Sequence, residues 1–205
     1  MEHSDGVLTP MDPNITLNLA EDLGEKELED ITDYPAVVGS IMYAALATRP
    51  DILYAVAALP RYNLQPFTSH MTAAKRVLQY LKSTAGYRIN FTGIGIGIDI
   101  GIDISNSLVG YSDPDWANDS ADRTSQVGHV FLASNGAISW QSRKHSLIAM
   151  STLEAEFITC SEASREAKSF LQLQNDIHSN DLPPLPINCD NQGALTIITM
   201  AIIKA

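Results

Sequence analysis

The chain has 205 residues, of which 45% are apolar, and its formal net charge at pH 7 is −11. This length allows one large domain or two small ones, and the apolar content is high enough for a packed core, which excludes an intrinsically disordered chain. Charges, Gly or Pro interrupt every apolar run before about 20 residues, so we expect no spanning helix. Residues 1–5 lack the regions of a signal peptide, so we expect an intracellular protein that is neither secreted nor membrane-bound.

The acidic and basic residues are unevenly distributed along the chain. Residues 21–33 contain seven carboxylates and one lysine, whereas basic residues gather later, at Lys75, Arg76, Lys82, Arg88, Arg143 and Lys144. Phosphate binding depends on Lys and Arg displacing counterions, so the net acidity argues against a nucleic-acid ligand. The local electrostatic field, however, decides where a polyanion binds. The two basic regions are therefore compatible with a nucleic-acid ligand.

The first part of the chain divides into a leader and a helical unit. Residues 1–33 are acidic and poor in aromatic side chains, which predicts a loosely ordered leader. From residue 34 to 92 the apolar spacing predicts three helices: one over 34–47, one that starts at Pro50 and ends or kinks at Pro60, and one over about 71–83. Thr68 or Ser69 is the expected N-cap of the third helix.

Residues 93–107 contain a two-residue repeat in which every second position from 94 to 104 is Ile and the others are Gly or Asp. Such low-complexity sequence is more typical of a flexible or aggregation-prone insert than of a binding site. We therefore place a domain boundary near residue 92.

Residues 108–205 predict an α/β domain with a mixed sheet. Strands are expected over 108–112, 128–134 and 137–142, with Pro114 ending the first and Asn135-Gly136 joining the other two in a hairpin. A long amphipathic helix follows from Ser151, with an apolar stripe of Leu153, Phe157, Cys160, Ala163, Ala167 and Leu171. A short strand at 187–190 and a helix from about Gln192 complete a β-β-β-α-β-α order.

Three carboxylates lie at positions in this order that the fold can bring to the same edge of the sheet. Asp113 ends the first strand, Glu156 lies in the long helix and Asp190 ends the fourth strand. If the first and fourth strands are parallel neighbours, both aspartates lie at one edge of the sheet and the helix brings Glu156 between them. Carboxylates this close repel one another unless cations neutralise them, and oxygen ligands favour Mg²⁺ or Mn²⁺. Two such ions would support hydrolysis of a phosphodiester.

Neighbouring acids have simpler explanations. Asp115 follows Pro114 and is expected outside the strand ladder, and Asp119 and Asp122 belong to a polar loop. Glu154 is the fourth residue of Ser151-Thr152-Leu153-Glu154, which matches a capping box. Glu156 instead flanks the apolar stripe, where an unpaired acid is costly.

Other polar residues give weaker signals. Asn191 and Gln192 follow the third acid and are candidates for contact with nucleic acid, although an Asn there is more typical of a helix cap. Arg143 and Lys144 are candidates for the same contact. Cys160 and Cys189 are expected to be small buried thiols without chemistry.

Four segments in this order resemble the ribonuclease H part of copia-type retrotransposon Pol polyproteins: residues 110–117, 136–144, 150–157 and 189–192. The helical unit resembles the end of the reverse transcriptase of that family, through residues 38–43, 47–52 and 73–82. Together the likeness covers most of residues 8–200.

The resemblance implies a ribonuclease H-like fold over residues 108–205 and cleavage of the RNA strand of an RNA–DNA hybrid. Asp113, Glu156 and Asp190 would be the catalytic residues and the ligands of Mg²⁺ or Mn²⁺. The expected partners are the hybrid and the remaining parts of the Pol polyprotein. The expected location is the cytoplasm, within a virus-like particle, or the nucleus.

The resemblance also predicts two absences. The Tyr-x-Asp-Asp signature of the polymerase palm is missing, so no DNA synthesis is expected. The family continues after the last helix with an Arg-Thr-Lys-His-Ile-Asp segment that carries a fourth acid, and without it the site for a second metal ion would be incomplete. The alternative is therefore an inactive remnant that keeps the fold and at most binds nucleic acid weakly. A host-recruited interaction module is a third class, supported only by the acidic leader.

Overall fold

The computed structural model describes residues 6–12, 17, 32–91, 108–115, 124–145, 149–178 and 184–203. The chain divides into two compact units, Met1–Arg88 and Ile89–Ala205, close to the boundary expected near residue 92. Several predictions lie outside the described residues: most of the acidic leader, the repeat at 93–107 and the loop that contains Asp119 and Asp122.

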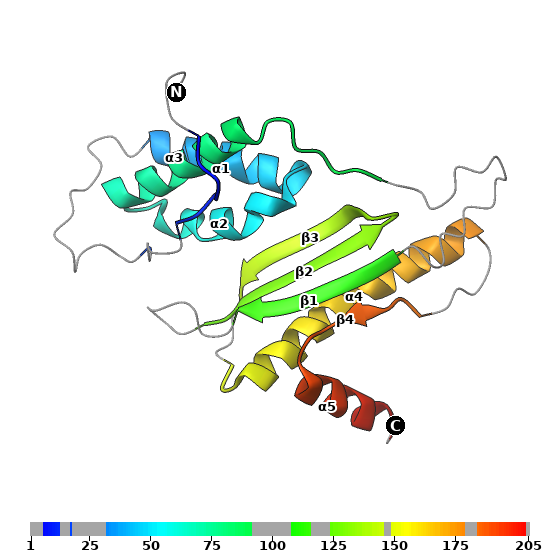
Figure 1. Ribbon diagram of the computed structural model, residues 1–205. Coiled ribbons are helices and arrows are strands. Elements are labelled where there is room, and N and C mark those ends of the chain that lie inside the picture. Colours follow the sequence, from blue (N-terminus) through cyan, green and yellow to red (C-terminus); the bar gives the residue numbers. More distant parts are fainter. Residues whose placement is uncertain are drawn as a thin grey trace, which may run out of the picture. The chain divides into compact units, whose positions relative to one another are not determined.

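The first unit is helical, as the apolar spacing predicts (Figure 1). Its elements are α1 (Asp33–Ala47), a 3-10 turn η2 (Pro50–Ile52), α2 (Leu53–Ala57), a second 3-10 turn η3 (Leu59–Tyr62) and α3 (Thr68–Ser83). The expected second helix is thus three short pieces. Pro60, the second residue of η3, cannot donate a helical hydrogen bond, which accounts for the break after α2.

The start of α3 differs from the prediction. Neither Thr68 nor Ser69 is the N-cap; that position is Phe67. The Phe67 N–H donates a hydrogen bond of 3.0 Å to Nδ1 of His70. His70 is fully buried and stacks on the ring of Tyr62 at 3.8 Å between centroids. An imidazole three residues into the helix therefore satisfies a backbone donor at the helix start and also fills the core of this unit.

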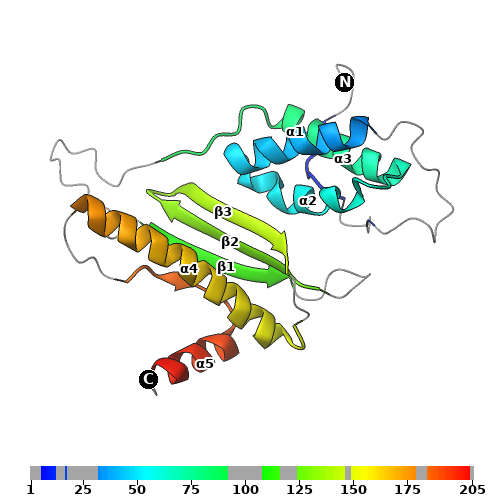
Figure 2. The same ribbon diagram turned by 180° about the vertical axis from the view of Figure 1, so that it is seen from behind.

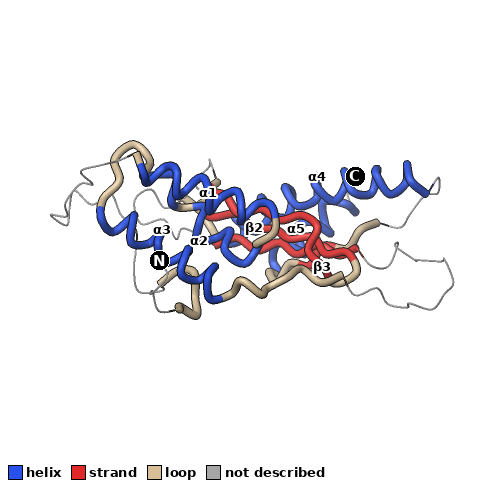
Figure 3. The backbone as a smooth tube through the Cα atoms, turned by 90° about the horizontal axis from the view of Figure 1, so that it is seen from above, coloured by secondary structure: helices blue, strands red, loops and turns tan. Residues whose placement is uncertain are grey.

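The second unit has the predicted β-β-β-α-β-α order. A four-stranded sheet is formed by β1 (Leu108–Asp115), β2 (Gln126–Ala133), β3 (Gly136–Lys144) and β4 (Ile187–Asn188), in the spatial order β3-β2-β1-β4. The first three strands are antiparallel, and β4 pairs with β1 in parallel. The long helix α4 (Thr152–His178) packs on β1 and β2, and α5 (Gln192–Ile203) follows β4 (Figures 2 and 3). The expected parallel pairing of the first and fourth strands is confirmed.

Pro114 does not end the first strand, contrary to the prediction. It pairs with Val127, and Asp115 pairs with Gln126. The short strand β4 pairs only with Gly110 and Tyr111, so within the described residues no strand lies beside the β4 side of β1 after Tyr111. A proline is tolerated on such an unpaired edge because no ladder hydrogen bond needs its missing N–H.

The predicted hairpin between β2 and β3 is present, with its turn shifted by one residue. Ser134 and Asn135 have φ angles of 49° and 64°, and Ala133 pairs with Gly136. Two central residues with positive φ are typical of a type I′ turn, which matches the twist of the strands. Gly136 is therefore the first residue of β3, and its missing side chain leaves room for the ring of Phe91.

The core of this unit lies between the sheet and α4. Phe131 and Ala163 are fully buried, and Ala167 lies beside them with the partly buried Phe170, Leu185 and Ile187. Apart from Glu156, the buried residues of α4 are small, which lets the helix approach the sheet closely. Phe157 belonged to the predicted stripe, but 42% of its side chain is exposed. Among the described residues, we find no helix with the length and apolar content that a membrane span requires.

Candidate metal centre

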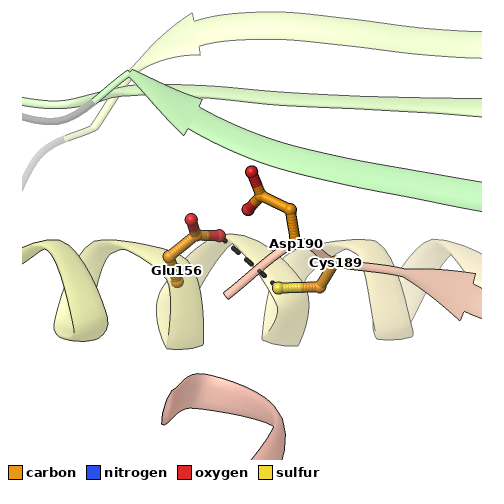
Figure 4. A group of neighbouring side chains, drawn as sticks. All are labelled: Glu156, Cys189 and Asp190. Carbon is orange, nitrogen blue, oxygen red and sulfur yellow. Dashed lines mark hydrogen bonds between the residues drawn. The ribbon is translucent and has the colours of Figure 1, made fainter. Parts of the chain in front are cut away.

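The register of the parallel pair positions two of the predicted acids. Tyr111 of β1 lies beside Asn188 of β4. Asp113 follows Tyr111 by two residues, and Asp190 follows Asn188 by two, so both aspartates reach the same end of the sheet. The first turns of α4 pass this end and supply Glu156 (Figure 4).

Three side chains form a compact group of potential ligands. A carboxylate oxygen of Glu156, Sγ of Cys189 and a carboxylate oxygen of Asp190 all lie within 4.8 Å of one another. Glu156 is buried, with 7% of its surface exposed, whereas Cys189 is half-buried and Asp190 is exposed. Figure 4 shows Glu156 pointing from α4 toward the two residues that follow β4. The Cys189 thiol donates a hydrogen bond of 3.6 Å to Oε2 of Glu156.

Asp113 lies next to this group but is not a member of it. Successive side chains of a strand point to opposite faces, and along β1 Ser112 is buried while Tyr111 and Asp113 are exposed. Ser112 lies close enough to Cys160 of α4 to influence the pKa of its thiol. Asp113 therefore lies on the face of the sheet opposite to Ser112, and it is close enough to Asp190 for the two charges to interact.

The three acids influence one another electrostatically. Burial raises the pKa of Glu156 above its usual range, and the charges of Asp190 and Asp113 raise it further, although the hydrogen bond from Cys189 opposes the shift. Burial also raises the pKa of Asp113, with smaller contributions from Asp190 and Asp115. The charges that shift these two carboxyl groups are all negative. A cation bound among these carboxylates would therefore be electrostatically favourable.

The donor set fits a divalent cation. Glu156, Asp190 and Asp113 offer carboxylate oxygens, which are the ligands that Mg²⁺ and Mn²⁺ prefer. Protein sites for Mg²⁺ commonly use one or two carboxylates and leave the other positions to water or substrate oxygens. The pair formed by Glu156 and the exposed Asp190 matches that pattern, and Asp113 is the nearest further carboxylate on β1.

The neighbouring acids have structural roles. Glu154 accepts a hydrogen bond of 2.8 Å from the N–H of Met150, and its own N–H donates to Oγ of Ser151 at 3.1 Å. The predicted capping interaction is thus present, except that Glu154 reaches the residue before the cap. Asp115 is the last residue of β1 and pairs with Gln126, so its expected place outside the ladder is wrong.

The four candidates for nucleic-acid contact are not equivalent. Oδ1 of Asn191 accepts a hydrogen bond of 3.0 Å from the N–H of Ala194, so Asn191 caps α5, and Gln192 is the exposed first residue of that helix. Arg143 donates to Oε1 of Glu162 at 2.5 Å. That ion pair offsets the positive charge of Arg143. Lys144 ends β3 and is partly buried.

Cys189 is the member of the group that the sequence did not predict. We expected a buried thiol without chemistry, which describes Cys160 but not the half-buried Cys189. The available signal was its place directly before Asp190, at the end of a strand. A residue there leaves the ladder together with the acid, so both side chains can reach Glu156.

Comparisons with known proteins identify several relatives. The Secreted RxLR effector protein 161 of Plasmopara viticola is 42% identical over 134 residues, which are 65% of this chain and 88% of that protein. The retrovirus-related Pol polyprotein from transposon TNT 1-94 of Nicotiana tabacum is 38% identical over 167 residues, 80% of this chain. That from transposon RE1 of Arabidopsis thaliana is 37% identical over 188 residues, 92% of this chain.

The match to the polyproteins is a match to a segment of them. The chain spans 12% of the length of each of these two polyproteins. No protein-family model matches the chain, and no solved structure matches it significantly. The relatives share the sequence across both units, since the RE1 match extends over 92% of the chain. The chain is therefore a relative of retrotransposon Pol polyproteins and corresponds to a segment of such a polyprotein.

Proposed function

We propose that the second unit is the ribonuclease H-like part of a retrotransposon Pol polyprotein and hydrolyses the RNA strand of an RNA–DNA hybrid. The first unit would correspond to the helical end of the reverse transcriptase. The observation that carries the proposal is the approach of Glu156 to Asp190, with Asp113 in electrostatic contact with both. Similarity to retrotransposon Pol polyproteins supports a substrate of this class, and the resemblance of four segments supports the reaction.

The residues of this chain have distinct roles in the proposed site. Glu156 is held by the capped first turns of α4, and its buried position limits the rotamers that it can adopt. Asp190 is exposed and ends a strand, so it can face both a cation and a substrate phosphate. Asp113 approaches from β1. Bound Mg²⁺ or Mn²⁺ would supply activation of a water molecule and stabilisation of the leaving oxygen.

The hybrid would lie across the exposed end of the sheet. Gln192 is exposed directly after this end and Lys144 ends β3, so these two side chains are the best placed of the four candidates. Asn191 would act indirectly by fixing the start of α5 beside Asp190. Arg143 would contact phosphate only by leaving Glu162 or sharing its guanidinium with it.

An inactive remnant that keeps the fold is the alternative function class. The specific observation in its favour is the position of Asp113, which lies outside the group formed by Glu156, Cys189 and Asp190. In this alternative the acids bind a cation without bringing it to a phosphodiester.

Cleavage of a labelled RNA–DNA hybrid tests the proposal. The purified chain is incubated with the hybrid and Mg²⁺ or Mn²⁺, together with the variants Asp113→Asn and Asp115→Asn. We expect cleavage by the parent and by Asp115→Asn, and loss of cleavage in Asp113→Asn, because only Asp113 is placed beside Asp190. Absence of cleavage by the parent with either cation would support the remnant. Equal losses in both variants would contradict the role given to Asp113.

A further inference from the structure

The group beside α4 contains a sulfur atom that the proposed reaction does not use. Sγ of Cys189 lies within 4.8 Å of carboxylate oxygens of both Glu156 and Asp190. Its thiol donates to Oε2 of Glu156, an oxygen that a cation at this site would need. The thiol is half-buried, so a dissolved ion can reach it.

A thiolate changes which cation such a site prefers. Mg²⁺ takes oxygen ligands, whereas Zn²⁺ takes Cys, His and carboxylate ligands in tetrahedral sites. We propose that Glu156, Cys189 and Asp190 form a binding site for a thiophilic divalent cation such as Zn²⁺, which competes with Mg²⁺ for the two carboxylates. The binding site itself is independent of the proposed hydrolysis, and only the competition rests on it.

The geometry of the group suits a tetrahedral ion with three protein ligands. Ligand atoms around tetrahedral zinc lie roughly 3.3–3.8 Å apart, given bond lengths of about 2.0–2.3 Å. The three atoms here lie within 4.8 Å of one another, so small side-chain rotations bring them to that spacing. The fourth position would be left to water, since the group supplies three ligand atoms and Asp190 is exposed.

The binding step balances as an exchange of a proton for a metal bond. The S–H bond of Cys189 breaks, the proton passes to solvent, and a bond from sulfur to the ion forms. The hydrogen bond to Oε2 of Glu156 is lost in the same step, which frees that oxygen to become a ligand. Neither oxidant nor reductant is involved. Binding therefore tightens as pH rises, because the proton is a product.

The second cysteine provides a matched control. Cys160 also lies on α4, one helical turn after Glu156, but it is buried and does not belong to the ligand group. If both thiols only fill space, replacing either cysteine with serine leaves metal binding unchanged. If the thiol of Cys189 binds the ion, only the replacement of Cys160 leaves metal binding unchanged.

Co²⁺ serves as the spectroscopic probe, because a thiolate bound to this ion gives a near-ultraviolet charge-transfer band. Co²⁺ is titrated into the reduced parent chain and into Cys189→Ser and Cys160→Ser, with circular dichroism to check folding, and Zn²⁺ is then added to displace it. We expect the band in the parent and in Cys160→Ser but not in Cys189→Ser. Mutation of a residue that only supports a metal ligand typically lowers metal affinity by roughly 10–100-fold. Cys189→Ser removes a ligand itself, so it should lower Zn²⁺ affinity by more than that.

The outcomes separate this inference from the proposed function. A parent chain without the band, or Cys189→Ser that binds Zn²⁺ as tightly as the parent, would overturn the inference even if the hybrid is cleaved. A band that depends on Cys189 would support it even if no hybrid is cleaved. If the hybrid is cleaved, Zn²⁺ should inhibit the parent at lower concentrations than it inhibits Cys189→Ser, with each rate taken relative to that of the same protein without Zn²⁺.

Discussion

Asp51 in the first unit and Glu156 in the second unit have different electrostatic surroundings. In the first unit Asp51 accepts hydrogen bonds of 2.9 and 2.7 Å from Arg49, and this contact lowers the pKa of the carboxyl group. The same guanidinium donates to the carbonyl and hydroxyl oxygens of Thr84 after α3. In the second unit Glu156 faces Asp190 and a thiol, and its pKa is raised.

The difference distinguishes a structural acid from a candidate ligand. A carboxylate with a structural role is matched by a cation or a hydrogen-bond donor of the same chain, as Asp51 is by Arg49 and Glu154 is by the N–H of Met150. A carboxylate that binds a cation from solution is left without that match. The second unit therefore carries a local electrostatic penalty, which ion binding would remove.

The largest expected effect concerns the core that supports the second unit. Phe131 is fully buried and contacts the ring of Phe170 at 5.4 Å between centroids. Phe131→Ala should destabilise this unit by about 3–5 kcal/mol, because it leaves a cavity between the sheet and α4. The exposed Ile138→Ala on β3 is the control and should cost far less. Denaturant unfolding measures both, and equal costs would contradict the core assigned here.

The next effect distinguishes Glu156 from a structural acid such as Asp51. Because the pKa of Glu156 is raised in the folded state, its contribution is most favourable at low pH and becomes a penalty as pH rises through the raised value. Without divalent cations Glu156→Gln should therefore melt higher than the parent at neutral pH. With Mg²⁺ at 100 times its Kd, the parent should gain about 2.7 kcal/mol and the variant almost nothing.

Calorimetric melting with and without Mg²⁺ checks this prediction. A variant that melts lower than the parent in the absence of divalent cations would mean that Glu156 is a structural acid like Asp51.

A smaller effect is expected for the ion pair between Arg49 and Asp51 in the first unit. Arg49→Met removes a guanidinium that also lies 5.7 Å from the ring centroids of Tyr80 and Tyr87, and we expect a loss of about 2 kcal/mol. The pKa of Asp51 is lowered, so its stabilising contribution exists above its ordinary pKa and disappears as pH falls through the lowered value. The difference between parent and variant in urea unfolding should therefore shrink in acid; a constant difference would refute the ion pair's contribution.

The smallest effect concerns the helix start that holds Glu156. Ser151→Ala removes the acceptor for the Glu154 N–H and should cost about 1 kcal/mol. Ser161→Ala, at an exposed position in the middle of α4, is the control and should be nearly neutral. Thermal unfolding compares the two, and the prediction fails if Ser161→Ala costs as much.

Local patterns predicted the framework of the second unit because they carry direct physical signals. Alternation along β2 and β3, the capping box at Ser151 and the strand before Asp190 indicated the element order. The parallel pairing of β1 with β4 was an assumption, and the structure has it. Those same signals placed Glu156 and Asp190 at one edge of the sheet.

The predictions that were wrong concern residues whose environment depends on a neighbouring strand or helix. Pro114 continues β1 because β4 is too short to reach it, and the length of a partner strand is not visible in the sequence of β1. Phe157 is exposed because small side chains, not the largest ones, allow α4 to approach the sheet. Cys189 joined the ligand group because α4 presents Glu156 to it, a contact between residues 33 positions apart.

The central claim is that Glu156 is a cation ligand while Glu154, two residues earlier on the same helix, is a structural cap. Titration of Mn²⁺ monitored by electron paramagnetic resonance tests it in the parent, Glu156→Gln and Glu154→Gln. We expect the parent and Glu154→Gln to bind Mn²⁺ with similar affinity and Glu156→Gln to lose binding. Equal Mn²⁺ affinity in all three proteins, or a loss confined to Glu154→Gln, would contradict the account.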